Sequence, residues 1–136
     1  MTIGVLARRT GVPVKTLREY EDLGLIYTVG RSAGNYRLFG EEALWCVGVV
    51  GALRGLGLTL SEIREIAAAY LGDTKEPIGP RLAKVLQAVR VRTQTRINEL
   101  RAQLARIDEY EAAHRAELSG RAAFRMDDPR ARPHRA

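Results

Sequence analysis

Residues 3–26 decide the fold, and they read Ile-Gly-Val-Leu-Ala-Arg-Arg-Thr-Gly-Val-Pro-Val-Lys-Thr-Leu-Arg-Glu-Tyr-Glu-Asp-Leu-Gly-Leu-Ile. A first helix is predicted over 3–10, and Gly11 supplies the backbone conformation that ends it. A second helix is predicted over 13–23, because Pro13 is tolerated in the first turn, where its missing N–H is not needed. Two short helices joined by a tight turn are typical of a helix-turn-helix element that enters the major groove of DNA.

The segments that follow predict a hairpin and two more helices. Two short strands, over 27–29 and 36–39, flank a loop rich in turn-forming residues. A third helix is expected over 41–55. Thr59 and Glu62 have the spacing of a capping box, in which each side chain satisfies a free backbone N–H, so a fourth helix is expected to start there.

A linker over 73–80 leads into one long predicted helix over 81–118, about 57 Å long at 1.5 Å per residue. Its apolar positions recur in steps of three and four, which is typical of a coiled-coil seam. A chain this small cannot cover such a seam, so a homodimer is expected. The seam positions are Leu82, Leu86, Val89, Thr93, Ile97, Leu100, Leu104 and Ile107. Residues 119–136, which are rich in arginine, are predicted to form a disordered basic tail.

Composition narrows the class of protein. The 136 residues carry a net charge of +6, which favours a polyanionic partner. Residues 1–72 hold 8 basic and 7 acidic side chains, so this segment is not basic in bulk, and the positions of its charges rather than their sum favour DNA binding. No apolar run reaches the roughly 18 residues of a membrane span, and no export signal is recognised, so a cytoplasmic protein without a membrane partner is expected. A single cysteine excludes an intramolecular disulfide.

Residues 3–118 resemble the MerR family of bacterial transcription regulators. The matching segments are Ile3-Gly4-x-Leu6-Ala7-x-x-Thr10-Gly11-Val12, Thr16-Leu17-Arg18-x-Tyr20-Glu21-x-x-Gly24-Leu25-Ile26, Tyr36-Arg37-Leu38-Phe39 and Leu56-Gly57-Leu58-Thr59-Leu60-x-Glu62-Ile63. The resemblance implies a mainly α fold, with an N-terminal winged helix-turn-helix DNA-binding domain over 1–72 and a long antiparallel coiled-coil dimerisation helix. It also implies a dimer that bends and untwists promoter DNA with an overlong spacer, so that RNA polymerase can engage both promoter elements.

The resemblance assigns DNA contacts to the second helix. Val14, Lys15 and Thr16 lie at its start, where recognition helices meet base edges; Lys15 could reach a guanine, and Thr16 a thymine methyl group or a phosphate. The alternative is a solvated lysine and a threonine that serves the helix start. Arg18 and Tyr20 resemble phosphate clamps. Their alternative is a surface arginine and a packed tyrosine.

In the predicted wing, Arg31, Tyr36 and Arg37 resemble residues that bind the DNA backbone. Such contacts position a protein without specifying sequence. Tyr36 could instead pack within the hairpin, and Asn35 is expected to serve the turn. Glu19 stands where the family often has a further tyrosine. Its carboxylate repels phosphate, so one clamp is expected to be lost.

No metal, iron–sulfur cluster or other cofactor is expected. Metal-sensing relatives hold cysteines near the start of the long helix and in a loop after it. This chain has Thr74 and Lys75 at the first place and no cysteine after Cys46, while His114 and His134 are isolated. Because Cys46 lies inside an apolar helix, a buried and inert thiol is expected.

The third predicted helix departs most from the family, because residues 44–53 are apolar nearly all round. Such a helix is normally buried on most sides, and Gly48 and Gly51 permit close backbone approach. Trp45 is therefore expected to be largely shielded from water. Either the partner's long helix or a small apolar ligand near Trp45 and Val49 would shield it, and a contact with another protein stays open.

The sequence shows no catalytic triad, phosphate loop or carboxylate pair in a cleft, so an enzyme is not expected. The predicted function is that of a dimeric, sequence-specific DNA-binding transcription regulator of the MerR type, with a small-molecule effector left open. The alternative is an architectural DNA-binding protein that needs no effector or is controlled by a protein partner.

Overall fold

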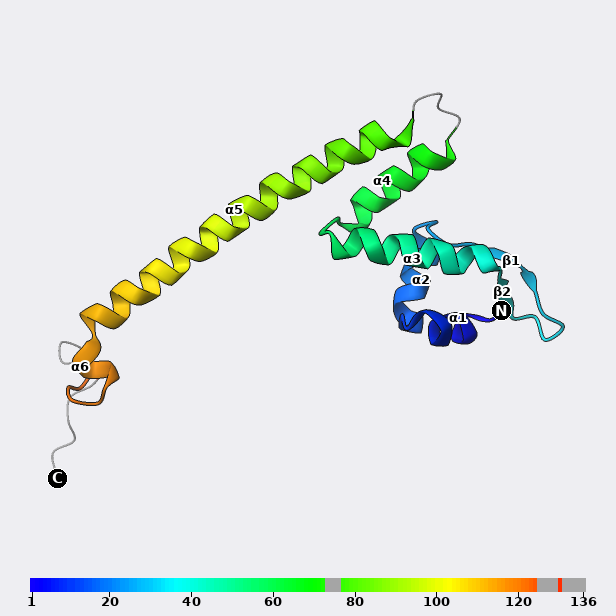
Figure 1. The fold of residues 1–136 in the computed structure, drawn as a ribbon. Helices are drawn as coiled ribbons and strands as arrows, with labels where there is room; N and C mark the ends of the chain where they lie inside the picture. The colour runs from blue at the N-terminus through cyan, green and yellow to red at the C-terminus, as the bar shows by residue number, and fades with distance from the viewer. Residues whose placement is uncertain (73–76, 125–129, 131–136) are drawn as a thin grey trace. The chain divides into compact units, whose positions relative to one another are not determined.

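The structure, a computed structural model, describes residues 1–72, 77–124 and 130 (Figure 1). It is mainly α-helical with one hairpin. The elements in chain order are α1 (Ile3–Thr10), α2 (Val14–Asp22), β1 (Thr28–Arg31), β2 (Arg37–Phe39), α3 (Glu41–Gly55), α4 (Leu60–Leu71), α5 (Ile78–Ala113) and α6 (Arg115–Leu118). The chain divides into two compact units, Met1–Val91 and Arg92–Ala136, which are described separately. No described helix is long and apolar enough to cross a membrane.

Helices α1 and α2 form the predicted helix-turn-helix. The hydroxyl of Thr2 accepts a hydrogen bond from the Val5 N–H at 3.4 Å, which satisfies one of the free donors at the start of α1. Helix α2 begins at Val14, and Pro13 is its N-cap rather than its first helical residue. The two helices pack against each other, and α1 also packs against α3. Helix α3 therefore supports the helix-turn-helix.

The hairpin that forms the wing is antiparallel, with Thr28 opposite Phe39 and Arg31 opposite Arg37. Its strands start one residue later than predicted, so Tyr27 and Tyr36 lie just outside them. A bulge between Thr28 and Gly30 shifts the register. Bulges increase local twist, so this one turns the tip of the wing relative to its base.

The turn between α3 and α4 is closed by two backbone hydrogen bonds. The Gly57 N–H donates to the Arg54 carbonyl at 2.9 Å, and the Leu58 N–H donates to the Leu53 carbonyl at 3.2 Å. This Schellman arrangement requires a positive φ at Gly57, which is +100°. The turn directs Leu58 into the core, where it is fully buried, and an added Cβ on Gly57 would lie 3.3 Å from the Val89 side chain.

Helix α4 starts at the predicted capping box. The Thr59 N–H donates to the Glu62 carboxylate at 2.8 Å, and the Glu62 N–H donates to the Thr59 hydroxyl at 3.1 Å. Both hydrogen bonds of the motif are therefore present.

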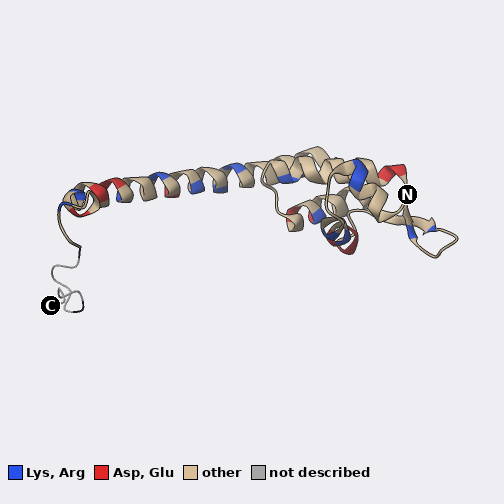
Figure 2. Ribbon diagram, turned by 90° about the horizontal axis from the view of Figure 1, so that it is seen from below, with Lys and Arg blue, Asp and Glu red and all other residues tan. Residues whose placement is uncertain are grey.

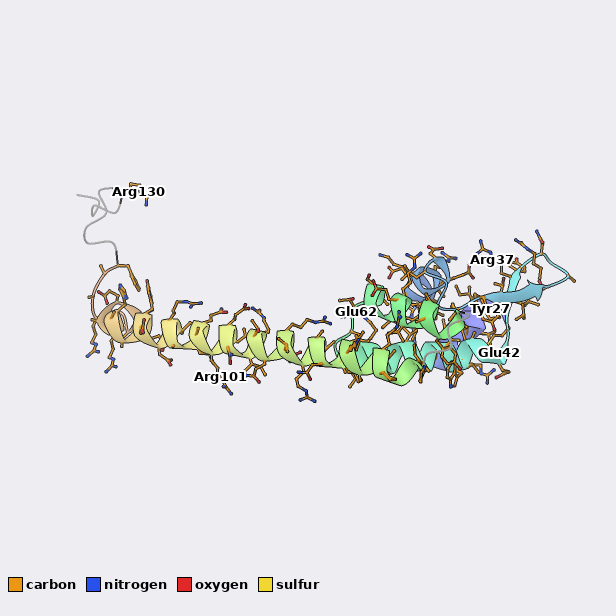
Figure 3. The ribbon with its side chains drawn as sticks, turned by 90° about the horizontal axis from the view of Figure 1, so that it is seen from above. Tyr27, Arg37, Glu42, Glu62, Arg101 and Arg130 are labelled. Atoms are coloured by element: carbon orange, nitrogen blue, oxygen red, sulfur yellow. The ribbon has the colours of Figure 1, made fainter. Side chains whose placement is uncertain are left out.

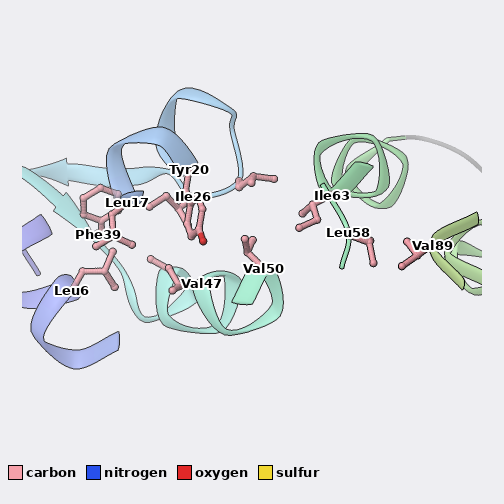
Figure 4. Close-up of a cluster of buried hydrophobic side chains, with 12 residues drawn as sticks. Leu6, Leu17, Tyr20, Ile26, Phe39, Val47, Val50, Leu58, Ile63 and Val89 are labelled. Carbon is pink, nitrogen blue, oxygen red and sulfur yellow. The ribbon is translucent and has the colours of Figure 1, made fainter. Parts of the chain in front are cut away.

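One aliphatic cluster forms the core of Met1–Val91 (Figure 4). Each helix of the unit contributes to it, together with β2 and the segment after α2. Its fully buried large side chains are Phe39, Leu6, Leu17, Ile26 and Leu58. Among the described residues no polar or charged side chain is buried, so dispersion and the hydrophobic effect hold this unit together.

The first turns of α5 correct the predicted dimer seam. Val89 is 5% exposed and belongs to the core cluster, and Leu82 packs partly against the same cluster. Val89 therefore serves its own chain rather than an open seam, whereas Leu82 is only half-buried and its seam role stays a prediction. The other apolar seam positions, Leu86, Ile97, Leu100, Leu104 and Ile107, are exposed in the chain alone, and Thr93 is exposed as well.

The long helix is also shorter at its end than predicted. Helix α5 covers Ile78–Ala113, so it begins three residues before residue 81, and a break at His114 separates it from α6. The His114 ring stacks on the Tyr110 ring, with 4.1 Å between ring centroids, and its Nδ1 lies 3.0 Å from the Tyr110 carbonyl oxygen. A predicted continuous helix over 81–118 is therefore wrong.

The start of the predicted disordered tail is ordered. Gly120, with a φ of +80°, ends α6, and the Arg121 N–H donates to the Ala116 carbonyl at 2.8 Å. The Phe124 ring then stacks beside the His114 ring, with 6.0 Å between centroids. Residues 119–124 therefore fold back on α6, which corrects the prediction for this part. Residues 125–129 and 131–136 lie outside the described structure.

Candidate DNA-binding surface

Helix α2 presents two basic side chains to solvent. Lys15 and Arg18 are exposed, and neither makes an ion pair or hydrogen bond with a described residue. Val14 and Thr16 are half-buried at the start of the helix. Free cationic groups beside small side chains suit an approach to phosphates and base edges, because no internal partner has to be displaced.

A notch separates α2 from the wing. It encloses about 380 Å³ and is lined by Thr2, Ile3, Arg18, Glu21, Asp22, Tyr36, Arg37 and Phe39. We call it the α2–wing notch. Three of the predicted DNA contacts, Arg18, Tyr36 and Arg37, thus meet around one concavity although they come from different elements. Two guanidinium groups and a phenol hydroxyl around such a space provide donors that match phosphate oxygens.

Glu21 and Arg37 join the two walls of the α2–wing notch. The Arg37 guanidinium donates to the Glu21 carboxylate across 16 residues of sequence, and it points toward α2 from the strand (Figure 3). The side chain of Glu21 is 18% exposed and that of Arg37 is 62% exposed. The pair therefore fixes the direction of Arg37 while leaving much of its guanidinium open to solvent.

The wing loop is closed by its own hydrogen bonds. The Ser32 hydroxyl accepts from the Tyr36 N–H at 3.1 Å, and the Asn35 N–H donates to the Ser32 carbonyl at 2.9 Å. Asn35 has a φ of +67°, so its predicted role in the turn is confirmed. Arg31 donates to the Asn35 carbonyl at 3.1 Å and stays exposed, so its guanidinium lies along the wing rather than free of it.

Basic residues on the hairpin are visible in Figure 2. Tyr36, 70% exposed, extends from the loop beside them. The wing therefore offers two guanidinium groups and a phenol at its surface, donors of the kind that contact a DNA backbone without reading sequence.

Comparisons with known proteins agree on one family. A family model described as "MerR HTH family regulatory protein" matches residues 1–70. The chain is 37% identical over 102 residues to the nodulation protein NolA of Bradyrhizobium sp. (strain NC92), covering 75% of this chain and 40% of NolA. It is 35% identical over 100 residues to the ZntR homolog of Haemophilus influenzae, an HTH-type transcriptional regulator, covering 74% of this chain and 73% of that protein.

A solved structure shows the same fold. The transcription regulator PbrR691 from Ralstonia metallidurans CH34, in complex with lead(II), superposes with a TM-score of 0.69 at 29% identity, covering 80% of this chain and 83% of that chain. The chain belongs to the MerR family. It therefore carries the DNA-binding unit of a MerR-type transcription regulator.

One predicted DNA contact of this MerR unit, Tyr20, is largely buried in the chain. Tyr20 is 7% exposed, and its ring packs with Leu17 and Ile26 in the core (Figure 4). Residues three apart lie on the same face of a helix, so Tyr20 follows Leu17 inward. The ring is therefore held in the core, and a phosphate contact of its hydroxyl, which is paired with no described residue, stays a prediction. Glu19, by contrast, is exposed, and its carboxylate lies on the solvent side of α2.

Cys46 differs from the expectation of a buried thiol, because it is half-buried. Desolvation by burial raises the pKa of the thiol, and the negative charge of Glu42 raises it further. A raised pKa keeps the thiol protonated at neutral pH and slows its reactions. Within residues 1–72, 77–124 and 130, no three His, Cys, Asp or Glu side chains lie close enough to hold a metal ion.

The outer face of α3 is open in this MerR chain. Trp45 is 63% exposed, so no described part of the chain shields it. An added Cβ at Gly48 or Gly51 would meet no atom within 4 Å, so neither glycine serves a close approach inside the chain. Burial of this face, as predicted, would therefore need a second molecule. Shielding of Trp45 by a partner or ligand stays a prediction.

Sequence reasoning missed Glu21 as a functional residue. Its sequence signal was weak, because the partner Arg37 lies on another element. Glu21 follows Val14 and Leu17 at helical spacing, so it lies on the inward side of α2, where the wing reaches the helix.

Proposed function

We propose that this protein is a MerR-type transcription regulator that binds duplex promoter DNA through α2 and the wing. The observation that carries the proposal is the α2–wing notch, which brings Arg18, Tyr36 and Arg37 together around a space of about 380 Å³. Lys15 and Thr16 at the start of α2 would meet base edges, while the notch would hold the DNA backbone. Arg31 would add a backbone contact from the wing.

We further propose that the protein acts as a homodimer through an antiparallel pairing of α5. The pairing is supported by the exposed apolar side chains that form one stripe along α5, because burying apolar surface in a dimer interface is favourable. These side chains are Leu86, Ile97, Leu100, Leu104 and Ile107. Val89 is left out of the seam, since it is buried within its own chain, while the half-buried Leu82 keeps its predicted place. A two-fold dimer would present two recognition helices to two half-sites.

Family membership supports a promoter with an overlong spacer as the target, distorted so that RNA polymerase engages both promoter elements. Bending a site of 20–30 base pairs costs of order 1–6 kcal/mol by elastic estimates. Two notches and two wings provide phosphate contacts that could repay this cost. NolA exceeds this chain in length, as the match covers 40% of it, so functions of its remaining part are not transferred.

Selection of binding sites from a random duplex library tests the proposal. Wild-type protein should enrich an inverted repeat, and its affinity should fall steeply as salt rises. Lys15→Ala should relax the base preference of the selected site. Arg18→Ala should weaken binding to selected and random duplexes by similar factors, because a phosphate contact carries no base information. No enrichment, or equal effects of both variants on selected and random DNA, would overturn the assigned roles.

A further inference from the structure

A second concavity lies between α3 and α4, away from the α2–wing notch. It encloses about 410 Å³, and we call it the α3–α4 groove. Its α3 wall is one face of that helix, since the contributing residues follow helical spacing from Glu42 to Leu53. Ile66 and Tyr70 of α4 stand opposite, and the first turn of α5 closes one side with Ile78 and Leu82. All these residues belong to the Met1–Val91 unit.

Aromatic side chains stand around this groove. Tyr27, Trp45 and Tyr70 line it, and each is more than half exposed in the chain. The rest of the wall is almost entirely aliphatic. Grooves of this volume with an apolar wall and few polar groups are typical of small-molecule sites. Aromatic faces also attract cations through their quadrupoles.

Among the described residues of the groove wall, Glu42 alone is charged, and its charge is negative. Glu42 lines the groove near Tyr27 (Figure 3) and makes no hydrogen bond or ion pair with a described residue. An added Cβ on Gly40 would meet the Glu42 Oε2 atom, so the carboxylate lies at the N-terminal end of α3, at the Tyr27 end of the groove. No described lysine or arginine lines the groove. The neighbouring Glu41 behaves differently, because it is paired with Arg9 at 3.1 Å.

We propose that the α3–α4 groove binds a small hydrophobic ammonium compound, with its apolar body between α3 and α4 and its positive group beside Glu42. Three aromatic rings and an unpaired carboxylate complement such a cation in both shape and charge. The positive net charge of the whole protein works against cations, so a preference for an amine has to come from the groove itself. Binding of the amine does not depend on DNA binding, whereas a role of the groove as the regulator's effector site rests on the proposed function.

Three compounds that share one phenylbutyl body test the proposal: 4-phenylbutylamine, 4-phenylbutan-1-ol and 4-phenylbutyrate. The 136-residue protein is titrated with each at pH 7.4 without DNA. Equilibrium dialysis gives the affinity, and the fluorescence of Trp45, the single tryptophan, reports the location. The amine should bind about fivefold more tightly than the alcohol, the order expected for an ion pair that stays partly open to water. The carboxylate should bind most weakly.

Variants of Glu42 and Glu41 distinguish binding of the amine in the groove from nonspecific electrostatic attraction of the amine to the protein. Glu42→Gln should reduce the amine-to-alcohol ratio to about one while leaving the affinity for the alcohol unchanged. Glu42→Lys should invert the order, so that 4-phenylbutyrate binds better than the amine. Glu41→Gln is the matched control, because it removes an adjacent carboxylate that faces Arg9, and it should leave the ratio unchanged.

Two results would overturn the proposal. One is equal binding of the three compounds, or a preference that Glu42→Gln does not alter. The other is a free protein in which Trp45 emission is already blue-shifted and protected from acrylamide, since a second copy would then cover the groove. Either result leaves the proposed DNA binding intact, and a failure of DNA binding leaves these titrations unaffected.

Discussion

Glu21 on α2 and Arg37 on β2 form an ion pair that joins the recognition helix to the wing. The carboxylate is the more buried partner, so the pair is sheltered on the side of α2 and open on the side of the wing. The carboxylate of Glu21 partly neutralises the Arg37 guanidinium, which weakens its attraction for a phosphate. The same pair holds the Arg37 side chain in a fixed direction before DNA binds.

Replacing Glu21 by Gln should change how DNA is bound. Arg37 loses its partner and becomes fully available to phosphate, so affinity for random duplex should rise. The log–log slope against salt should become steeper by about 0.9 for one additional phosphate contact. Discrimination between the selected site and random DNA should fall, because the wing is no longer held in register. Fluorescence anisotropy titrations at several salt concentrations measure both quantities.

Glu19→Gln is the matched control for this prediction. Glu19 is exposed on the same helix and has no partner among the described residues. Its removal should raise affinity by relieving repulsion, while the ratio of selected to random binding stays the same. If Glu21→Gln behaves like Glu19→Gln, the ion pair has no role in orienting the wing.

Replacing Leu100 by Asp should dissociate the proposed dimer. The side chain lies in the exposed apolar stripe of α5, and a charge there would be desolvated in a coiled-coil seam. Ala102 lies on the opposite side of the same helix, so Ala102→Asp should leave the dimer intact. Sedimentation equilibrium at micromolar concentration compares the two. A wild-type monomer, or equal effects of both substitutions, would contradict the seam.

Replacing Gly57 by Ala should destabilise the fold by about 1–2 kcal/mol, the cost of a left-handed backbone for a residue with a Cβ. Its φ is +100°, and the added atom would press on Val89 at 3.3 Å. Gly48→Ala, in the open middle of α3, should instead stabilise by about 0.5–1 kcal/mol. Urea unfolding at one fixed protein concentration gives both values. A destabilising Gly48→Ala would reveal a close contact on the outer face of α3.

The thiol of Cys46 should react slowly with iodoacetamide at pH 8. Burial and then Glu42 raise its pKa, so at a given pH below that value a smaller fraction is thiolate than in a free cysteine peptide. Glu42→Gln removes the second cause and lowers the pKa, so alkylation should become faster and its pH profile should move to lower pH. A slower reaction in the variant would show that Glu42 does not face the thiol.

Much of the fold was predictable because its signals are local. The ends of α1 and α3 coincide with the prediction, and the capping box of Thr59 and Glu62 is present as expected. These features depend on residues within one turn of helix. The family resemblance added the order of the elements, which local patterns alone do not determine.

The errors arose where a side chain depends on distant packing. The ring of Tyr20 lies on the core side of α2 at its spacing from Leu17, while the predicted phosphate contact of its hydroxyl stays a prediction. Val89 fits a heptad pattern, yet the turn at Gly57 covers it within the same chain. The pairing of Glu21 with Arg37 could not be read from spacing, because it exists only once the hairpin lies against α2.

Hydroxyl-radical footprinting of the selected duplex tests the central claim most directly. A dimer that binds through two copies of α2 and the wing should protect two half-sites related by a two-fold axis. Distorted DNA between them should show altered cleavage. Arg18→Ala should weaken both protected regions together. A single protected region, or a footprint that Arg18→Ala leaves unchanged, would contradict the account.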